Sequence, residues 1–255
     1  MKLIDLSRPL ENDVAADPPG LGPRIDYLNH TQSMPGMLAM FPGLEANQLP
    51  HAEAWAVERL TVSTHNGTHV DAPWHFASTM NRGERAWTID EVPLDWFYRP
   101  GLKLDFRDMP DGRVVTASEL ADRVASTGHE LQPFDIVLMN TRAGAAYGTA
   151  GYVDAGCGFG REATLWLLER GVRVMGTDGW SWDAPFSHTR KRYAESGDAS
   201  IIWEGHKASL EIGYCHIEKL ANLEVLPAAG FLVSSFPFKI KGASAGFARV
   251  VAILE

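Results

Sequence analysis

Three histidines and one aspartate, His65, His69, Asp71 and His75, lie close together in a chain that holds nine histidines. Imidazole nitrogens and carboxylate oxygens are the ligands that Zn²⁺, Mn²⁺ and Fe²⁺ accept in proteins. A histidine considered singly is more often a surface or hydrogen-bonded core residue than a ligand. Four candidate ligands or bases at this spacing reverse that expectation and predict a metal site.

The surrounding residues place this stretch after a strand rather than on a helix. Two of its histidines have the spacing of the helical HExxH zinc motif, but Asn66 stands where that motif requires Glu. Gly67 and Pro73 are both unfavourable inside a helix. Residues 58–64 alternate polar with apolar side chains, which is typical of a strand. On extended backbone, the spacing of two from His69 to the aspartate puts both side chains on one face.

The segment from residue 65 to residue 76, HNGTHVDAPWHF, resembles the signature of the metal-dependent cyclase family, which includes bacterial kynurenine formamidase and isatin hydrolase. The resemblance implies that the metal ligands include His65, His69 and Asp71. It also implies that His75 works as the catalytic base or acid.

A second segment near residue 210 is similar to the family's other metal-binding segment. His206 and Glu218 are separated by twelve residues, and the resemblance implies that both complete the centre. The family has Glu at the later position in members with two metals, with Asp71 as the bridge. We therefore expect one or two divalent ions, zinc or manganese. Without the family, this signal is weak, and His216 and Glu211 remain open as alternatives.

Residues 176–183, GTDGWSWD, resemble a further family segment. Asp178 or Asp183 would orient a ligand histidine through its second nitrogen. Turn formation at the end of a strand is the alternative for both aspartates. Several aromatic residues are candidate walls for a flat or aromatic substrate, with core packing as the alternative: Trp74, Phe159, Trp180, Trp182 and Phe186.

Two glycine-rich motifs are not assigned to chemistry. Residues 156–160 have the spacing GxGxG, with no strand leading directly into them, and they favour a helix entry turn over a dinucleotide loop. Residues 242–246 match GxSxG, but a serine hydrolase needs a histidine later in the chain, and none follows.

Composition restricts the classes of partner. The net charge of −9 disfavours nucleic acid, and no apolar run approaches the ~20 residues that span a bilayer. The cysteines, Cys157 and Cys215, form no CxxC pair, and the N-terminal residues lack the apolar core of a signal peptide. We expect a cytoplasmic protein whose partner is a small-molecule substrate.

The length of 255 residues suits a single domain, residues 1–255. Residues 11–55 hold so many prolines and glycines that they exclude long helices and central strands, and they predict a loop-rich insertion that is a substrate lid, a subunit contact or plain packing. The resemblance implies an α/β fold, a swivelling β/β/α domain with a mixed central sheet and flanking helices. It also implies a homodimer or homotetramer.

Patterning predicts several regular elements along the chain. Thr116 and Glu119 form a capping box that begins a helix reaching about residue 125. A β-α-β unit is expected over residues 134–175. Residues 236–240 and 249–253 resemble the closing hairpin of the cyclase family.

The reaction class follows from the predicted site. A metal-activated water would hydrolyse an amide, either a formamide or a cyclic amide, with His75 moving the proton. Two alternatives remain open at this point. One is another metal-assisted reaction, such as lactone hydrolysis or a dehydration, and the other is a metal-binding protein without catalysis.

Overall fold

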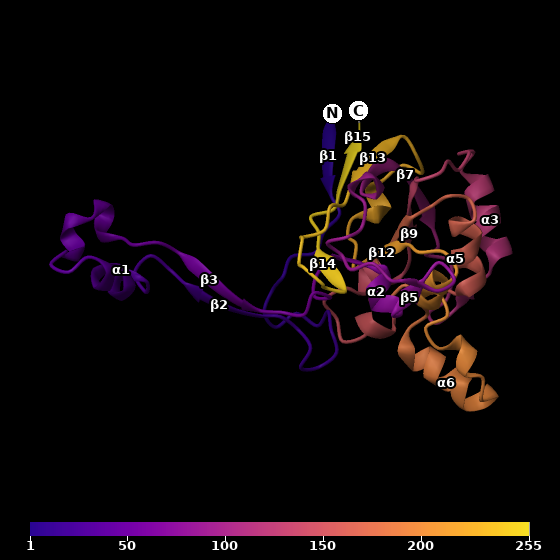
Figure 1. Cartoon of the computed structure of the whole chain (residues 1–255), viewed down its shortest axis with the longest axis horizontal. Coiled ribbons are helices and arrows are strands. Elements are labelled where there is room, and N and C mark those ends of the chain that lie inside the picture. Colours follow the sequence, from indigo (N-terminus) through magenta and orange to yellow (C-terminus); the bar gives the residue numbers. More distant parts are fainter. Residues whose placement is uncertain (255) are drawn as a thin grey trace.

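The computed structural model describes residues 1–254, and a mixed nine-stranded sheet forms their centre (Figure 1). In spatial order the strands are β1 (Lys2–Asp5), β15 (Val251–Leu254), β13 (Phe231–Ser234), β7 (Tyr98–Asp105), β9 (Ile136–Asn140), β11 (Val174–Thr177), β12 (Cys215–Glu218), β4 (His69–Asp71) and β14 (Ala245–Phe247). The strands β7, β9, β11 and β12 run parallel, and the outer pairs are antiparallel.

The central strands are apolar because both faces of the sheet are covered. In β9 every residue is buried, as expected for a parallel strand. Ile136 and Leu138 enter one hydrophobic core, whereas Val137 and Met139 enter the core on the opposite face. At β9, the sheet thus lies between two apolar layers.

Two helices pack on the second of these cores. They are α3 (Ala117–Ser126) and α5 (Arg161–Leu168), with Leu120 and Leu167 completely buried. The predicted capping box begins α3, since the Thr116 hydroxyl accepts from the Glu119 amide and the Glu119 carboxylate accepts from the Thr116 amide. The α/β fold with a mixed central sheet and flanking helices is confirmed.

A third long helix, α6 (Phe186–Ser196), and several short elements complete the body. The short elements are α2 (Pro73–Phe76), α4 (Ala143–Ala146), the paired strands β5 (Thr79–Met80) and β6 (Glu84–Arg85), the paired strands β8 (Val114–Val115) and β10 (Gly158–Phe159), and the 3₁₀ helices 94–96, 152–154, 199–201, 206–210 and 223–225. Among residues 1–254, no helix has the length and apolar character needed to cross a membrane.

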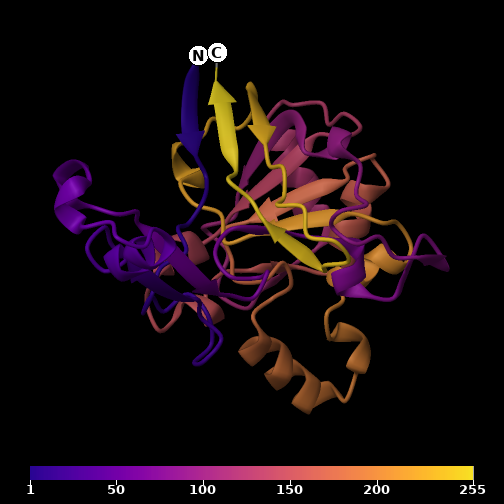
Figure 2. The ribbon, with the colours of Figure 1, turned by 60° about the vertical axis from the view of Figure 1, so that its left-hand side comes forward.

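One segment stands away from the body (Figures 1 and 2). It comprises residues 24–61, which we call the arm: β2 (Arg24–Leu28), α1 (Met34–Met40), the 3₁₀ turns 46–48 and 50–52, and β3 (Val57–Thr61). β2 and β3 pair with each other and with no strand of the central sheet. Large apolar side chains of the arm are exposed, among them Tyr27, Met40, Phe41 and Leu60.

The predicted closing hairpin is wrong in its first strand. Residues 236–240 form only an isolated bridge, from Pro237 to Ala248, and β13 takes their place beside β15. The physical reason is that Pro237 has no amide hydrogen to donate to a strand ladder, while the apolar β13 alternates buried and half-buried residues. The second strand of the predicted hairpin, residues 249–253, is found as β15.

Candidate active site

The centre of the site is set by the pairing of β4 with β12. The antiparallel register places His69 opposite Glu218 and Asp71 opposite His216. Val70, between the two β4 residues, points into the hydrophobic core, so its neighbours share the other face. Neither His69 nor Asp71 is exposed. The two adjacent strands therefore bring four titratable side chains together in a buried position.

His65 joins this group from the turn before β4. Its Nδ1 lies 2.9 Å from Asp71 Oδ1, and its Nε2 lies 3.1 Å from the Ser244 hydroxyl. The turn depends on Gly67, which has a φ of +58° and whose missing Cβ would lie 2.9 Å from the Leu10 side chain. The left-handed backbone at Gly67 thus allows the turn that places His65 in contact with Asp71.

His206 approaches from the opposite side, on the 3₁₀ helix 206–210. Its Nε2 is 3.9 Å from Glu218 Oε1, while its Nδ1 is hydrogen-bonded to Asp183. Asp183 also accepts from the backbone amides of Gly205 and His206, at 2.8 and 3.1 Å. Of the two aspartates predicted to orient a ligand histidine, Asp183 contacts one.

Asp178 lies elsewhere in the fold. Its carboxylate accepts from the amide and the hydroxyl of Thr141, the latter at 2.6 Å. Burial raises the pKa of Asp178 to about 7, against these hydrogen bonds. This aspartate joins the ends of β9 and β11, as the turn alternative suggested.

Two ligand atoms in the cluster have no hydrogen-bond partner. They are His69 Nε2 and Asp71 Oδ1, both buried and 3.3 Å apart; the Asp71 oxygen has only the ion-pair contact with His65 Nδ1 at 2.9 Å. Buried polar atoms without a partner are costly, and a divalent cation would satisfy both. The mixed nitrogen and oxygen donors suit zinc, manganese or iron. The residues present therefore fit a metal ion.

The spatial arrangement allows two ion positions that share Asp71. One group of potential ligands is Asp71, His206, His216 and Glu218, and the other is His65, Asp71 and His75; within each group the ligand atoms lie within 4.8 Å of one another. A carboxylate common to both groups is placed as a bridge would be. The assignment of individual ligands stays a prediction.

His216 is the residue that sequence reasoning left undecided. It is fully buried, and its Nε2 lies 3.0 Å from Asp71 Oδ2 and 3.1 Å from Glu218 Oε1. Although burial disfavours its charge, hydrogen bonds to the two carboxylates raise its pKa to about 9. The other alternative, Glu211, pairs with Arg161 outside the cluster. The useful signal was the spacing of two on an apolar strand, which aligns His216 with Glu218.

Hydrogen bonding also controls the charges of the other members. Burial opposes ionisation of Asp71, but the adjacent imidazoles of His69, His216 and His65 outweigh it and lower the Asp71 pKa well below its usual value. Burial disfavours the imidazolium of His65, yet the hydrogen bond and charge of Asp71 raise its pKa. The aspartate is thus held as an anion at the centre of the group.

His75 lies beside the cluster on the one-turn helix α2. Its Nε2 is 3.8 Å from Asp71 Oδ2, and its ring centre is 4.1 Å from that of His65. Burial lowers its pKa to about 4, so the imidazole is neutral near pH 7, with a free lone pair, and is a weaker proton acceptor than an ordinary histidine. A general base has to be unprotonated before it accepts a proton.

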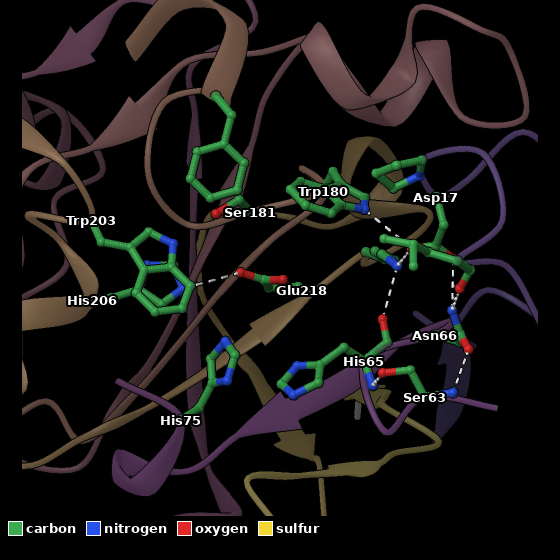
Figure 3. A pocket seen from close by; sticks show the side chains of 14 residues that line it. Asp17, Ser63, His65, Asn66, His75, Trp180, Ser181, Trp203, His206 and Glu218 are labelled. Atoms are coloured by element: carbon green, nitrogen blue, oxygen red, sulfur yellow. Dashed lines mark hydrogen bonds and ion pairs between the residues drawn. The ribbon is translucent and has the colours of Figure 1, made fainter. Parts of the chain in front are cut away.

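A cavity of about 240 Å³ opens beside these residues (Figure 3). His65, His75, His206 and Glu218 line one part of it, while Asp17 and Asn66 lie on the side away from His206. The cluster is therefore accessible to a small molecule from this side.

The aromatic residues predicted as walls divide into two groups. Trp180 and Phe186 line the cavity, with ring centres 5.7 Å apart. Phe159 and Trp182 are completely buried and stack on each other at 4.6 Å, so core packing describes them. Trp74 is half-exposed and does not line the cavity.

Trp203 lines the cavity although sequence reasoning missed it. Its ring stacks on that of His206, with centres 4.6 Å apart and planes within 9°, and its backbone has a φ of +58°. A non-glycine residue in the left-handed region is strained, which is common near functional sites. No periodic pattern in residues 198–205 marks this tryptophan.

Comparison with known proteins agrees with this geometry. Residues 4–184 match the model of a family described as "Putative cyclase", and the chain belongs to this cyclase family. A kynurenine formamidase of Erythrobacter litoralis is 29% identical over 199 residues, covering 76% of each chain. A kynurenine formamidase of Salinibacter ruber is 29% identical over 193 residues, covering 75% of this chain and 77% of the relative.

Solved structures share the fold. Isatin hydrolase A of Labrenzia aggregata, bound to benzyl benzoate, superposes with a TM-score of 0.74 at 25% identity, covering 99% of this chain and 93% of that one. Isatin hydrolase A of Ralstonia solanacearum also has a TM-score of 0.74, at 22% identity, with 100% and 92% covered. The latter likeness concerns the fold alone.

Proposed function

We propose that this protein is a metal-dependent hydrolase that cleaves the C–N bond of a formamide or cyclic amide in a flat or aromatic small molecule. The observation that carries the proposal is the buried cluster around Asp71, whose outer members open onto a cavity with His75 and two indole rings. The relatives named kynurenine formamidase and isatin hydrolase support the same class.

Five residues would hold the ion or ions, zinc or manganese: His65, His69, Asp71, His206 and Glu218. His216 is a sixth candidate because it is in contact with both carboxylates. A bound divalent ion lowers the pKa of water from about 15.7 toward ~7 and polarises a substrate carbonyl.

The chain's own side chains carry the proton and fix the geometry. His75, neutral at pH 7, takes a proton from the attacking water and returns it to the leaving nitrogen. Asp183 fixes the His206 ring through Nδ1, which leaves Nε2 directed at the cluster. Trp180, Phe186 and Trp203 contact the flat part of the substrate and exclude water from it.

A substrate panel tests this proposal. N-formylkynurenine, isatin, hydantoin and a simple lactone are offered to the protein with and without a chelator. We expect amide cleavage that the chelator abolishes. If the protein cleaves the lactone alone, the leaving atom is oxygen and the alternative of lactone hydrolysis is supported. If metal-loaded protein turns over none of the compounds, the proposed hydrolase is contradicted.

The arm supports a proposal about assembly and domain organisation. We propose that residues 1–255 form one domain from which the arm extends, and that the protein is a homodimer or homotetramer whose arms contact the neighbouring subunit. Four large apolar side chains, Tyr27, Met40, Phe41 and Leu60, are 50% to 67% exposed on an isolated hairpin. Exposed apolar groups so placed favour a protein interface.

We also propose a cytoplasmic location, which the two buried, unpaired cysteines support.

A further inference from the structure

An ion pair in the wall of the cavity has no part in the proposed reaction. Lys219 directly follows Glu218 at the end of β12, with a φ of +58° and a side chain that is 1% exposed. Its Nζ donates to the Asp17 carboxylate and, at 2.8 Å, to the backbone carbonyl of His65. A buried lysine in strained backbone thus lies beside the candidate metal ligands.

Asp17 is held equally firmly from its own side. It belongs to the loop that leads from β1 toward the arm, and its side chain is 7% exposed. Besides Lys219, it accepts from Trp180 Nε1 at 3.1 Å and from Asn66 Nδ2 at 3.0 Å (Figure 3). The carboxylate therefore joins the N-terminal loop to the metal motif and to one aromatic wall.

The pair adds no net charge to its part of the cavity wall. Lys219 is the one lysine or arginine among the cavity-lining residues of the described chain, 1–254. Asp17 cancels its charge at contact distance, and Pro18, Leu21 and Phe186 make nearby walls apolar. Away from the proposed metal centre, a substrate carboxylate beside this pair would lose water without gaining an unpaired cationic side chain, which is costly.

We propose that the Asp17–Lys219 pair determines specificity by neutralising the pocket, so that the enzyme prefers uncharged flat amides to amides that carry a carboxylate. The inference rests on the proposed amide hydrolysis and adds the charge class of the substrate. Asp17 and Lys219 are specificity residues and take no part in bond cleavage.

Because Asp17 and Lys219 carry opposite charges, removing each charge should change the substrate preference in opposite directions. Asp17→Asn retains the size of the side chain and removes its charge, which leaves the Lys219 ammonium available to a substrate carboxylate. Lys219→Met removes the ammonium and leaves the negative charge of Asp17. The first change should favour a carboxylate-bearing substrate, and the second should disfavour it further.

The test uses formanilide and 3-formamidobenzoate, which differ only by a ring carboxylate. The quantity measured is the ratio of kcat/KM for the carboxylate compound to that for formanilide. We expect Asp17→Asn to raise this ratio at least about tenfold, mainly through a lower KM for the carboxylate compound, and Lys219→Met to reduce it. Metal content and thermal unfolding are measured for every variant.

Two controls separate charge from displacement of the loop. Asp13→Asn makes the same chemical change at an exposed position of the same loop and should leave the ratio unchanged. The double variant Asp17→Asn/Lys219→Met removes both charges, and its ratio should return toward that of the unaltered protein. A ratio that stays raised in the double variant contradicts the proposal.

An unchanged ratio in folded Asp17→Asn and Lys219→Met proteins also overturns the inference. If the unaltered protein cleaves neither compound, the proposed hydrolysis of aromatic formamides is wrong. The charge preference of the pocket is then tested separately, by calorimetric binding of benzoate and benzamide. Asp17→Asn should bind benzoate at least about tenfold more tightly than the unaltered protein does, with benzamide unaffected. Equal benzoate affinities contradict it. If Asp17→Asn does not fold, Lys219→Met supplies the same test with the opposite sign.

Discussion

The edge of the central sheet that holds the metal cluster and the arm are constructed in opposite ways. At that edge, β4 is hydrogen-bonded on both sides, to β12 and to β14, and its three residues are buried. In the arm, β2 pairs only with β3, and every residue of β3 is exposed. The first region is hydrogen-bonded and buried within the chain, whereas the second leaves apolar side chains exposed.

This difference separates two kinds of information in the sequence. The cluster depends on spacing along strands, since a period of two puts His69 and Asp71 on one face. The environment of the arm depends on the surface that covers its apolar side chains, and the sequence of one chain does not specify that surface. We therefore expect substitutions in the cluster to affect chemistry strongly, and substitutions on the arm to affect association.

The largest effect should follow from Asp71→Asn, at the centre of the buried region. The carboxylate contacts four imidazoles within 3.8 Å, and the amide would lose the charge shared by both candidate ion positions. We expect loss of bound metal and a fall in kcat/KM of at least about 10³-fold. Metal analysis and steady-state kinetics provide the measurement. Retention of both full metal content and full turnover would refute the assigned centre.

The next effect should come from His75→Ala, at the border between cluster and cavity. Losing the proton acceptor should reduce kcat by about 10²- to 10⁴-fold while metal content is unchanged. The same measurements decide this prediction. Full turnover with unchanged metal would exclude His75 as the base, and loss of metal would make it a ligand of the group with His65 and Asp71.

Asp178 provides a second comparison inside the body, because it is a buried carboxylate that belongs to neither group of potential metal ligands. Burial raises its pKa to about 7 from 3.8, so between these values the folded protein binds a proton that the unfolded chain has lost. Its contribution to stability should therefore fall as the pH rises from about 4 to about 7. Relative to Asp178→Asn, the free energy of unfolding should fall by about 2–4 kcal/mol over this window.

Urea unfolding at several pH values measures this difference. Asp26→Asn, at an exposed site, is the matched control and should not change the pH dependence. Parallel pH profiles for the unaltered protein and Asp178→Asn would disprove the prediction.

The smallest effect should appear on the arm. Phe41→Glu places a charge on an apolar side chain that is 57% exposed, and it should weaken self-association by at least about tenfold with little change in thermal unfolding of the body. Asn47→Glu adds the same charge at an exposed polar position near the arm tip and should leave association unaltered. Sedimentation equilibrium compares the two variants. Identical association constants would exclude this part of the arm as an interface.

Local patterns predicted the features that local physics determines. The capping box of α3 is confirmed, because Thr116 and Glu119 satisfy each other's backbone within one turn. The strand spacing placed His69 with Asp71, and the resemblance added His206 and Glu218, which the structure brings to the same cluster.

Features that depend on long-range pairing could not be predicted. Local spacing aligns His216 with Glu218, but only the register of β4 with β12 places His216 opposite Asp71. The contact between Asp17 and Lys219 joins residues from opposite ends of the chain, and no motif links them. Trp203 reaches the cavity through a left-handed backbone that its residue type disfavours.

The most direct test of the central claim is turnover of a formamide or cyclic amide by metal-stripped and reconstituted protein, with the metal content measured in each sample. We predict that stripped protein retains less than about 1% of the activity and that Zn²⁺ or Mn²⁺ restores it at about one or two equivalents per chain. Full activity in protein that contains no metal would contradict the account.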